Sequence, residues 1–173
     1  MAAGVTSLGH RQRLLVMPDD GEQAVIDLLA LAKKSLRIKQ FKLQAPAVIK
    51  AMQDAHERGV KVQIMLNPHT SGGVRWNDEA FELFKKSGVD VRWTSKSFPV
   101  THEKSIVFDN KFALVATFNL AKKYFTLTRD HGLVTYDQDA VNQVISGFDA
   151  DWNNLEFKPD LTVGLVWSNL HSR

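Results

Sequence analysis

Residues 102–119 read HEKSIVFDNKFALVATFN, and this stretch decides the fold that we predict for the chain. Its two strand-like runs, 102–108 and 111–115, flank the pair Asp109-Asn110. Aspartate and asparagine tolerate the left-handed backbone conformation that a tight turn between two strands requires. The stretch therefore predicts a β-hairpin late in the chain.

Upstream of this hairpin, strand-like runs alternate with segments whose apolar residues recur at helical spacing. The expected strands are 14–17, 36–41, 60–66 and 89–93, and the expected helices are 22–34, 46–58 and 78–86. Strands that alternate with helices form βαβ units, whose strands run parallel and whose helices cover the sheet. We therefore expect an α/β fold with a layered α-β-α arrangement and a mixed, largely parallel sheet.

Downstream of the hairpin the pattern is less regular. Residues 120–128 are mixed, 132–136 resemble a strand, 139–152 a helix and 153–160 a linker. Residues 164–169, GLVWSN, then resemble the opening 14–19, LLVMPD, because both run from an apolar strand into turn-forming residues. We expect one domain over residues 1–158 and, over 159–173, a linker with the first strand of a truncated second repeat. An unrelated terminal strand is the alternative.

The composition places the chain among ordinary soluble globular proteins. Its 173 residues are 44% hydrophobic and 24% charged, and no apolar run approaches the roughly 18–20 residues that span a bilayer. Residues 1–13 lack the apolar core of a secretory signal, so we expect a cytoplasmic protein, with peripheral contact to a membrane as a further option. The absence of cysteine excludes disulfides, thiolate metal sites and cysteine nucleophiles. The net charge of +3 suits nucleic acid or anionic lipid as a partner without requiring either.

The hairpin places reactive side chains on one of its faces. Residues two apart in a strand point to the same side, so His102 and Lys104 project together. Glu103 and Ser105 face the other way. Asp109, at the turn, has the opposite parity to His102, which favours a role in supporting the loop or a neighbouring basic group.

The face that carries the histidine is suited to chemistry at a phosphodiester. Thr117 and Asn119 share a parity on the returning strand, so a phosphate between the strands can accept hydrogen bonds from Lys104 and Asn119. A nitrogen of His102 is then left to attack phosphorus, because imidazole is partly neutral near pH 7 and leaves again from a phosphohistidine. Such a site requires no metal and no cofactor.

Residues 102–109 and the downstream Asn119 resemble the signature of the phospholipase D superfamily, an HxKxxxxD motif followed by a Gly-Ser-x-Asn element. The resemblance covers most of the chain, since the family's half-domain is also an α/β unit with the motif in a late hairpin. It implies that His102 is the nucleophile or its proton-donating counterpart, and that Lys104 and Asn119 bind phosphate. It also includes Asp109 among the catalytic residues.

Two further positions bear on this resemblance. Ala116-Thr117 stands where the family has Gly-Ser, so Thr117 keeps a hydroxyl for substrate binding but adds a methyl group. The family also places an acidic residue about eleven positions beyond the asparagine, where it orients a catalytic imidazole, and Asp130 occupies that place. The alternative is that Asp130 pairs with Arg129 or a nearby lysine at the surface.

The family's reaction uses two histidines, whereas this sequence has one HxKxxxxD motif. Either two chains pair with their motifs facing each other, or the chain is half of a two-motif enzyme. The resemblance of residues 164–169 to residues 14–19 favours the second option. The resemblance thus implies phosphodiester hydrolysis or phosphatidyl transfer on phospholipids through a phosphohistidine, with a second such half as the partner. The alternatives are a metal-independent endonuclease that acts as a homodimer, and an inactive isolated half-domain.

Overall fold

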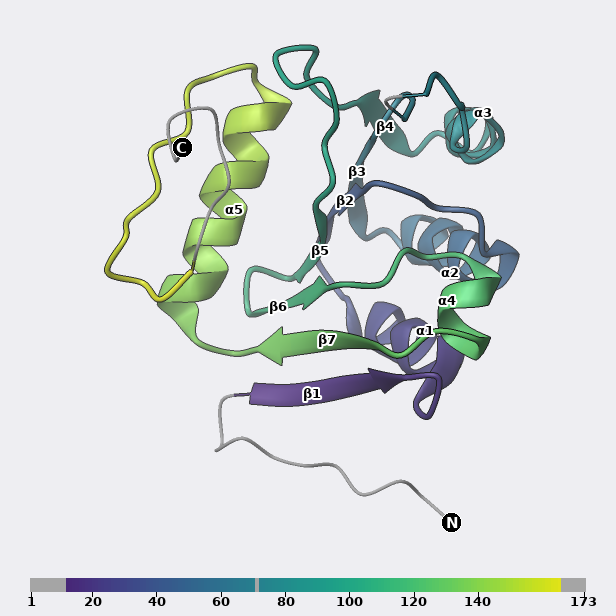
Figure 1. Cartoon of the computed structure of the whole chain (residues 1–173), viewed down its shortest axis with the longest axis horizontal. Coiled ribbons are helices and arrows are strands. Elements are labelled where there is room, and N and C mark those ends of the chain that lie inside the picture. The colour runs from purple at the N-terminus through teal and green to yellow at the C-terminus, as the bar shows by residue number, and fades with distance from the viewer. Residues whose placement is uncertain (1–11, 71, 166–173) are drawn as a thin grey trace.

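A seven-stranded sheet organises the residues that the computed structural model describes, 12–70 and 72–165 (Figure 1). Its strands are β1 (Gln12–Met17), β2 (Ser35–Gln40), β3 (Lys61–Leu66), β4 (Asp90–Trp93), β5 (Lys104–Phe108), β6 (Phe112–Ala116) and β7 (Asp130–Thr135). The helices are α1 (Gly21–Leu31), α2 (Pro46–Glu57), α3 (Asp78–Lys86), α4 (Lys122–Thr126) and α5 (Gln138–Trp152). The order across the sheet is β1-β7-β6-β5-β2-β3-β4.

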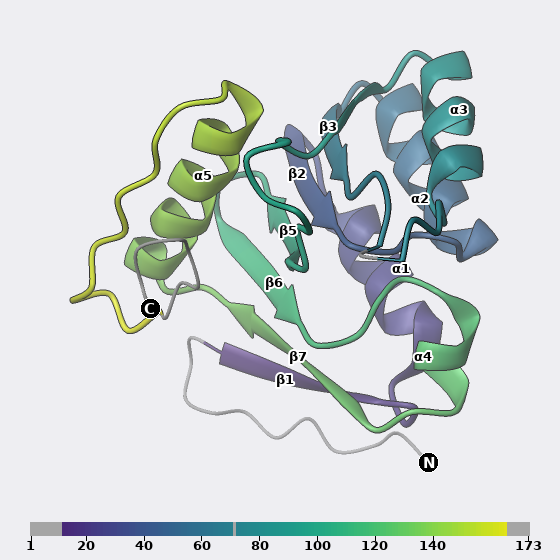
Figure 2. The same cartoon turned by 45° about the horizontal axis from the view of Figure 1, so that its top comes forward.

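Helices cover both faces of the sheet (Figure 2). On one face α1 and α2 pack over the main apolar core, which includes Leu28, Val48 and Ile106. On the other face α5 is the helix that the described residues place against the sheet, with Val144 against Val107 of β5. The α/β class and the layered α-β-α arrangement are therefore confirmed.

The expected majority of parallel strand pairs is not observed. Among the described residues β2–β3 and β3–β4 are parallel, whereas β1–β7, β7–β6, β6–β5 and β5–β2 are antiparallel. The helical connections predicted parallel pairing correctly for β2, β3 and β4. The strands β1 and β2 also run the same way, but β5, β6 and β7 lie between them. The hairpin and the return of the chain after α4 make these three antiparallel, so the mixed sheet is mostly antiparallel.

The predicted hairpin is formed by β5 and β6. Asp109 and Asn110 adopt φ angles of 53° and 58°, the left-handed conformation that such a turn requires. The first strand of the hairpin begins at Lys104, later than predicted, so His102 lies just before the sheet. This places the histidine at an end of the strand, where its side chain has room to meet a ligand.

The end of the described chain turns back along α5. Residues 161–165 form no strand, and Leu165 packs against the apolar cluster between α5 and the sheet. The rest of the expected second repeat, 166–169, lies outside the described residues, so the division at residues 158 and 159 stays a prediction. None of the helices that the structure describes is long and apolar enough to cross a membrane.

Candidate active site

The candidate site lies where the chain enters β5, beside the end of β2. Lys104 is the first residue of β5 and pairs with Gln40, the last residue of β2. The Lys104 side chain is buried; its Nζ donates to the carbonyl oxygen of His102 at 2.6 Å and lies 3.1 Å from His102 Nδ1. His102 and Lys104 therefore project together, as the alternation along a strand predicts.

Phe41 forms a wall behind this pair. Its ring centroid lies 4.6 Å from that of His102, and Lys104 Nζ lies 5.2 Å from the same ring. Trp76 meets the Phe41 ring edge-on at 5.6 Å, so the wall is itself supported. Sequence reasoning assigned Phe41 only to the end of a strand, because its contact with the histidine arises from the pairing of β2 with β5.

Burial and neighbouring charges shift the pKa values of both His102 and Lys104. Partial burial, and then the positive charge of Lys104, lower the pKa of His102 below its usual 6.5. Burial lowers the pKa of Lys104 to about 8, although the negative charge of Asp130 opposes that shift. At neutral pH the imidazole is therefore mostly uncharged, as a nucleophile must be, while the lysine is mostly an ammonium ion, as a phosphate ligand must be.

Asn119 follows β6 in a buried position. Its side chain is 4% exposed, and its Oδ1 has no hydrogen-bond partner within the described residues. The next residue, Leu120, donates its N–H to the carbonyl of Lys42, on the segment that leaves the site after β2. Leaving a buried acceptor unpaired costs about 1–3 kcal/mol, which a hydrogen-bond donor at this place would remove. Gln40, opposite Lys104, has a buried Oε1 that is unpartnered in the same part of the structure.

Thr117 and Thr128 hold the carboxylate of Asp130. The Thr117 hydroxyl donates to Asp130 Oδ1 at 2.7 Å and accepts the N–H of His131 at 3.0 Å, while Thr128 donates to the other carboxylate oxygen. The hydroxyl expected to bind phosphate is thus engaged with Asp130. Thr117 and Asp130 form one unit at the start of β7, and the methyl group of the threonine does not prevent it.

Asp130 does not take the partners that the sequence suggested within one chain. No hydrogen bond joins it to His102 among the described residues; instead its charge acts on Lys104. Its neighbour Arg129 pairs with Asp19 at 2.6 Å, which removes the alternative of an Arg129–Asp130 pair. The two threonines therefore hold the carboxylate where its charge acts on Lys104.

Gly132 allows the segment with Asn119 to lie close to the sheet. A Cβ atom at this glycine would lie 2.9 Å from Leu114 Cδ1 and 2.9 Å from Phe118 Cε1. Phe118 is fully buried, so its ring has little freedom to move aside. The absence of a side chain at Gly132 thus sets the position of Phe118, directly before Asn119.

Asp109, the last residue of the motif, lies at the opposite end of β5 from Lys104. It accepts backbone N–H groups from Lys33, Lys34 and Ser35 at distances of 2.7 to 3.1 Å. Burial alone would raise the pKa of Asp109, but these hydrogen bonds outweigh it and lower the pKa. Five residues of strand span about 16 Å at ~3.3 Å each, so Asp109 supports the loop before β2 and does not touch the site.

Comparison with known proteins places this geometry in a family. A family model described as "Cardiolipin synthase, PLD-like domain" matches residues 25–152, most of the chain. The chain belongs to this family. The resemblance inferred from the motif is therefore confirmed, and membership in the phospholipase D superfamily supports chemistry at phosphodiester bonds.

Two relatives of this PLD-like domain carry the name Mitochondrial cardiolipin hydrolase. The protein from Canis lupus familiaris is 25% identical over 131 residues, covering 76% of this chain and 49% of that protein. The protein from Homo sapiens is 26% identical over 142 residues, covering 80% and 54%. The chain thus spans about half the length of these relatives.

A solved structure shares the fold. The PLD-like domain matches Nuc from Salmonella typhimurium, described as a phospholipase D family member, with a TM-score of 0.73 and 25% identity. The match covers 86% of this chain and 99% of the Nuc chain. A single unit of the kind seen here therefore accounts for nearly the whole of that chain.

Two buried amides that sequence reasoning missed hold the loops of the PLD-like domain around its site. Asn67 Oδ1 accepts the N–H of Thr101 at 2.8 Å, directly before His102. Asn77 Nδ2 donates to the carbonyls of Phe41 and Asn67, each at 2.9 Å. The only signal in the sequence is a polar residue after a buried strand, which does not reveal a partner 34 residues away.

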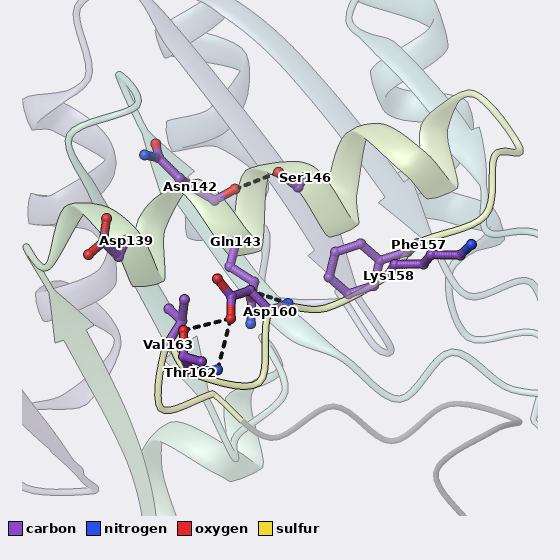
Figure 3. A pocket seen from close by; sticks show the side chains of 9 residues that line it. All are labelled: Asp139, Asn142, Gln143, Ser146, Phe157, Lys158, Asp160, Thr162 and Val163. Carbon is purple, nitrogen blue, oxygen red and sulfur yellow. Dashed lines mark hydrogen bonds between the residues drawn. The ribbon is translucent and has the colours of Figure 1, made fainter.

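A separate hollow of about 460 Å³ lies on the α5 side of the domain, away from these residues (Figure 3). Its lining consists of α5 side chains and of the segment that follows, among them Gln143, Ser146 and Asp160. None of the six site residues predicted from the sequence lines it. Across the described part of the chain, no group of three or more His, Asp or Glu side chains is arranged to hold a metal ion.

Proposed function

We propose that the PLD-like domain cleaves or transfers phosphodiester groups of phospholipids, with His102 forming a phosphohistidine. The observation that supports this most strongly is the His102–Lys104 pair, an uncharged imidazole against a buried ammonium. The ammonium of Lys104 donates to the free oxygens of a phosphodiester monoanion, and the Nδ2 group of Asn119 is the second donor that we assign to them. The imidazole is then the group left to attack phosphorus.

In the proposed reaction, His102 Nε2 attacks phosphorus, and a P–N bond forms as the bond to the leaving oxygen breaks. The Nδ1 atom faces Lys104 Nζ, so substrate binding has to turn this ammonium from the ring to the phosphate oxygens, with the ring proton on Nδ1. A second histidine protonates the leaving oxygen. Water, or an alcohol in a transfer reaction, then loses a proton to that second histidine, attacks phosphorus and releases His102.

The second histidine comes from a second copy of this unit. That copy lies either in a second chain or in a longer form of the same polypeptide. Pairing of two chains is supported by Nuc, since one unit covers 99% of that chain. The Asp130 carboxylate accepts from Thr117 and Thr128 and has no bond to His102 in the described chain, so its remaining lone pairs are the ones that would orient the imidazole of the second copy.

For the substrate we propose a phospholipid, because the family model is described as cardiolipin synthase and the relatives are named cardiolipin hydrolase. The phosphate ligands themselves do not distinguish a lipid from a nucleic acid, since both present a phosphodiester monoanion. Nucleic acid cleavage by a homodimer is therefore the outcome that the test must separate from lipid cleavage.

The test is an assay of the purified chain in EDTA on cardiolipin vesicles, with and without an added alcohol, and on single-stranded DNA. We expect release of phosphatidate from the vesicles and none of the DNA products. His102→Ala, with an unchanged circular dichroism spectrum, should abolish that release. DNA cleavage without lipid cleavage would overturn the lipid assignment, and undiminished turnover by His102→Ala would overturn the mechanism. Sedimentation of the active species decides where the second histidine resides.

A further inference from the structure

An ion cluster centred on a buried lysine lies on the face of the sheet opposite the site. Lys39 of β2 is 1% exposed, and its Nζ lies 2.9 Å from Glu103 Oε2 and 2.7 Å from Asp151 Oδ2. Ser105 donates its hydroxyl to the other Glu103 oxygen at 2.6 Å. The cluster thus joins β2 and α5 to the residue that stands between the two functional side chains of the motif.

Lys39 stays charged in this position. Burial lowers its pKa, but the charges of Glu103 and Asp151, together with their hydrogen bonds, outweigh burial and raise it. Burying the charge of Lys39 is costly because the ammonium is removed from water, so the cluster contributes little to stability compared with apolar packing. The cluster therefore calls for a reason other than stability.

That reason lies in how little else holds the peptide at His102. Residues 94–103 form neither helix nor strand, and the pairing of β5 with β2 begins only at Lys104. Asn67 holds the chain at Thr101, as described above. Between Thr101 and Lys104, Lys39 binds the Glu103 side chain on the face of the sheet opposite the site. On the face that carries the site, Lys104 Nζ donates to the backbone carbonyl of His102.

We propose that Lys39 is a positioning residue: acting through Glu103 and anchored by Asp151, it holds His102 in place against Lys104 and Phe41. Because Glu103 faces away from the site, a fixed Glu103 side chain sets the direction of the side chains before and after it. The catalytic consequence of this inference rests on the proposed function. The geometric consequence, a fixed imidazole, does not.

The chain offers a matched control two residues away on the same strand. Arg37 of β2 pairs with Asp149 of α5 at 2.9 Å, so it joins the same two elements on the same face. Within the described chain it forms no hydrogen bond or ion pair with Glu103; its remaining bond, at 2.6 Å, goes to Asn110 in the hairpin turn. Arg37→Met therefore loosens α5 as Lys39→Met does, but leaves the tether behind the histidine intact.

We expect Lys39→Met to lower kcat about 10- to 100-fold on cardiolipin vesicles with little change in KM, because misplacement by about 1 Å has costs of this size. Arg37→Met should leave kcat nearly unchanged, within about threefold, because the reacting groups keep their positions. The second readout is an NMR titration of the imidazole: in Lys39→Met the pKa of His102 should rise toward its usual value as its burial and its contact with Lys104 loosen. In Arg37→Met it should not move.

Two substitutions of Glu103 keep the proposal testable if Lys39→Met does not fold. Glu103→Gln keeps an oxygen that accepts from Lys39 and should retain most of kcat, whereas Glu103→Ala should reproduce the loss. Equal effects of Lys39→Met and Arg37→Met on kcat and on the imidazole titration would overturn the proposal, as would full activity in Glu103→Ala. If the wild-type chain turns over no phosphodiester, the proposed function fails, while the titration of His102 in the variants still decides the positioning role.

Discussion

The lowered pKa of Lys104 predicts an alkaline limit to the reaction at a pH far below that of an ordinary lysine. Burial lowers this pKa from 10.5 to about 8. At about pH 9 only ~10% of the free enzyme then keeps Lys104 as an ammonium ion, so kcat/KM should fall about 10-fold between about pH 7 and pH 9. On the acid side, the lowered pKa of His102 should hold kcat/KM nearly constant down to below 6.5.

Bound substrate makes this prediction sharper. A phosphate anion beside Lys104 raises its pKa, so the alkaline limb of kcat should lie at higher pH than the limb of kcat/KM. Initial rates on cardiolipin vesicles across this pH range measure both limbs. In Lys104→Arg the guanidinium does not titrate there, so the limb should vanish from whatever activity remains. A wild-type kcat/KM that stays flat to about pH 10, or an unchanged limb in Lys104→Arg, would refute the assignment.

Three further substitutions test the placement of individual residues. Lys104→Met should raise the melting temperature near neutral pH while abolishing turnover. Folding lowers the pKa of Lys104, so the charged lysine destabilises the folded wild-type protein. In the wild type this destabilisation disappears only as pH rises from about 8 to 10.5. Asp109→Ala should lower the free energy of unfolding in urea by about 2 kcal/mol with kcat unchanged, since backbone N–H groups lose their acceptor. The wild-type contribution of Asp109 is present above its unfolded pKa of 3.8 and is lost as pH falls through its lower folded pKa; a fall in kcat in this variant would contradict its supporting role. Gly132→Ala should cost about 1–3 kcal/mol and lower kcat by displacing Phe118 next to Asn119, and thermal melts with unaltered rates would count against that link.

Local rules were sufficient for the elements nearest the site. The left-handed turn at Asp109 and Asn110 follows from residue type, and the shared face of His102 and Lys104 follows from the period of an extended backbone. The first three helices were predicted from apolar spacing to within a few residues at each end. The motif at residues 102–109 and the downstream Asn119 identified the family, which the match over residues 25–152 confirms.

Strand order was beyond these rules. Alternating strands and helices predict parallel neighbours, and β2, β3 and β4 obey that prediction. Nothing in the residues of β1 reveals that β7 becomes its neighbour and that three strands separate it from β2. Such choices depend on how the whole set of strands and helices packs, which is why the sheet is mostly antiparallel.

The sequence by itself determined which side chains of the motif share a face, and therefore the chemistry that the site supports. Only the tertiary structure decided their partners: Thr117 with Asp130, Asp109 with a distant loop, and Lys39 with Glu103 and Asp151. The last two partners are 64 and 112 residues away from the lysine. A repeat along the chain shows which way a side chain points, whereas the segment that it meets there is set by packing between elements far apart in sequence.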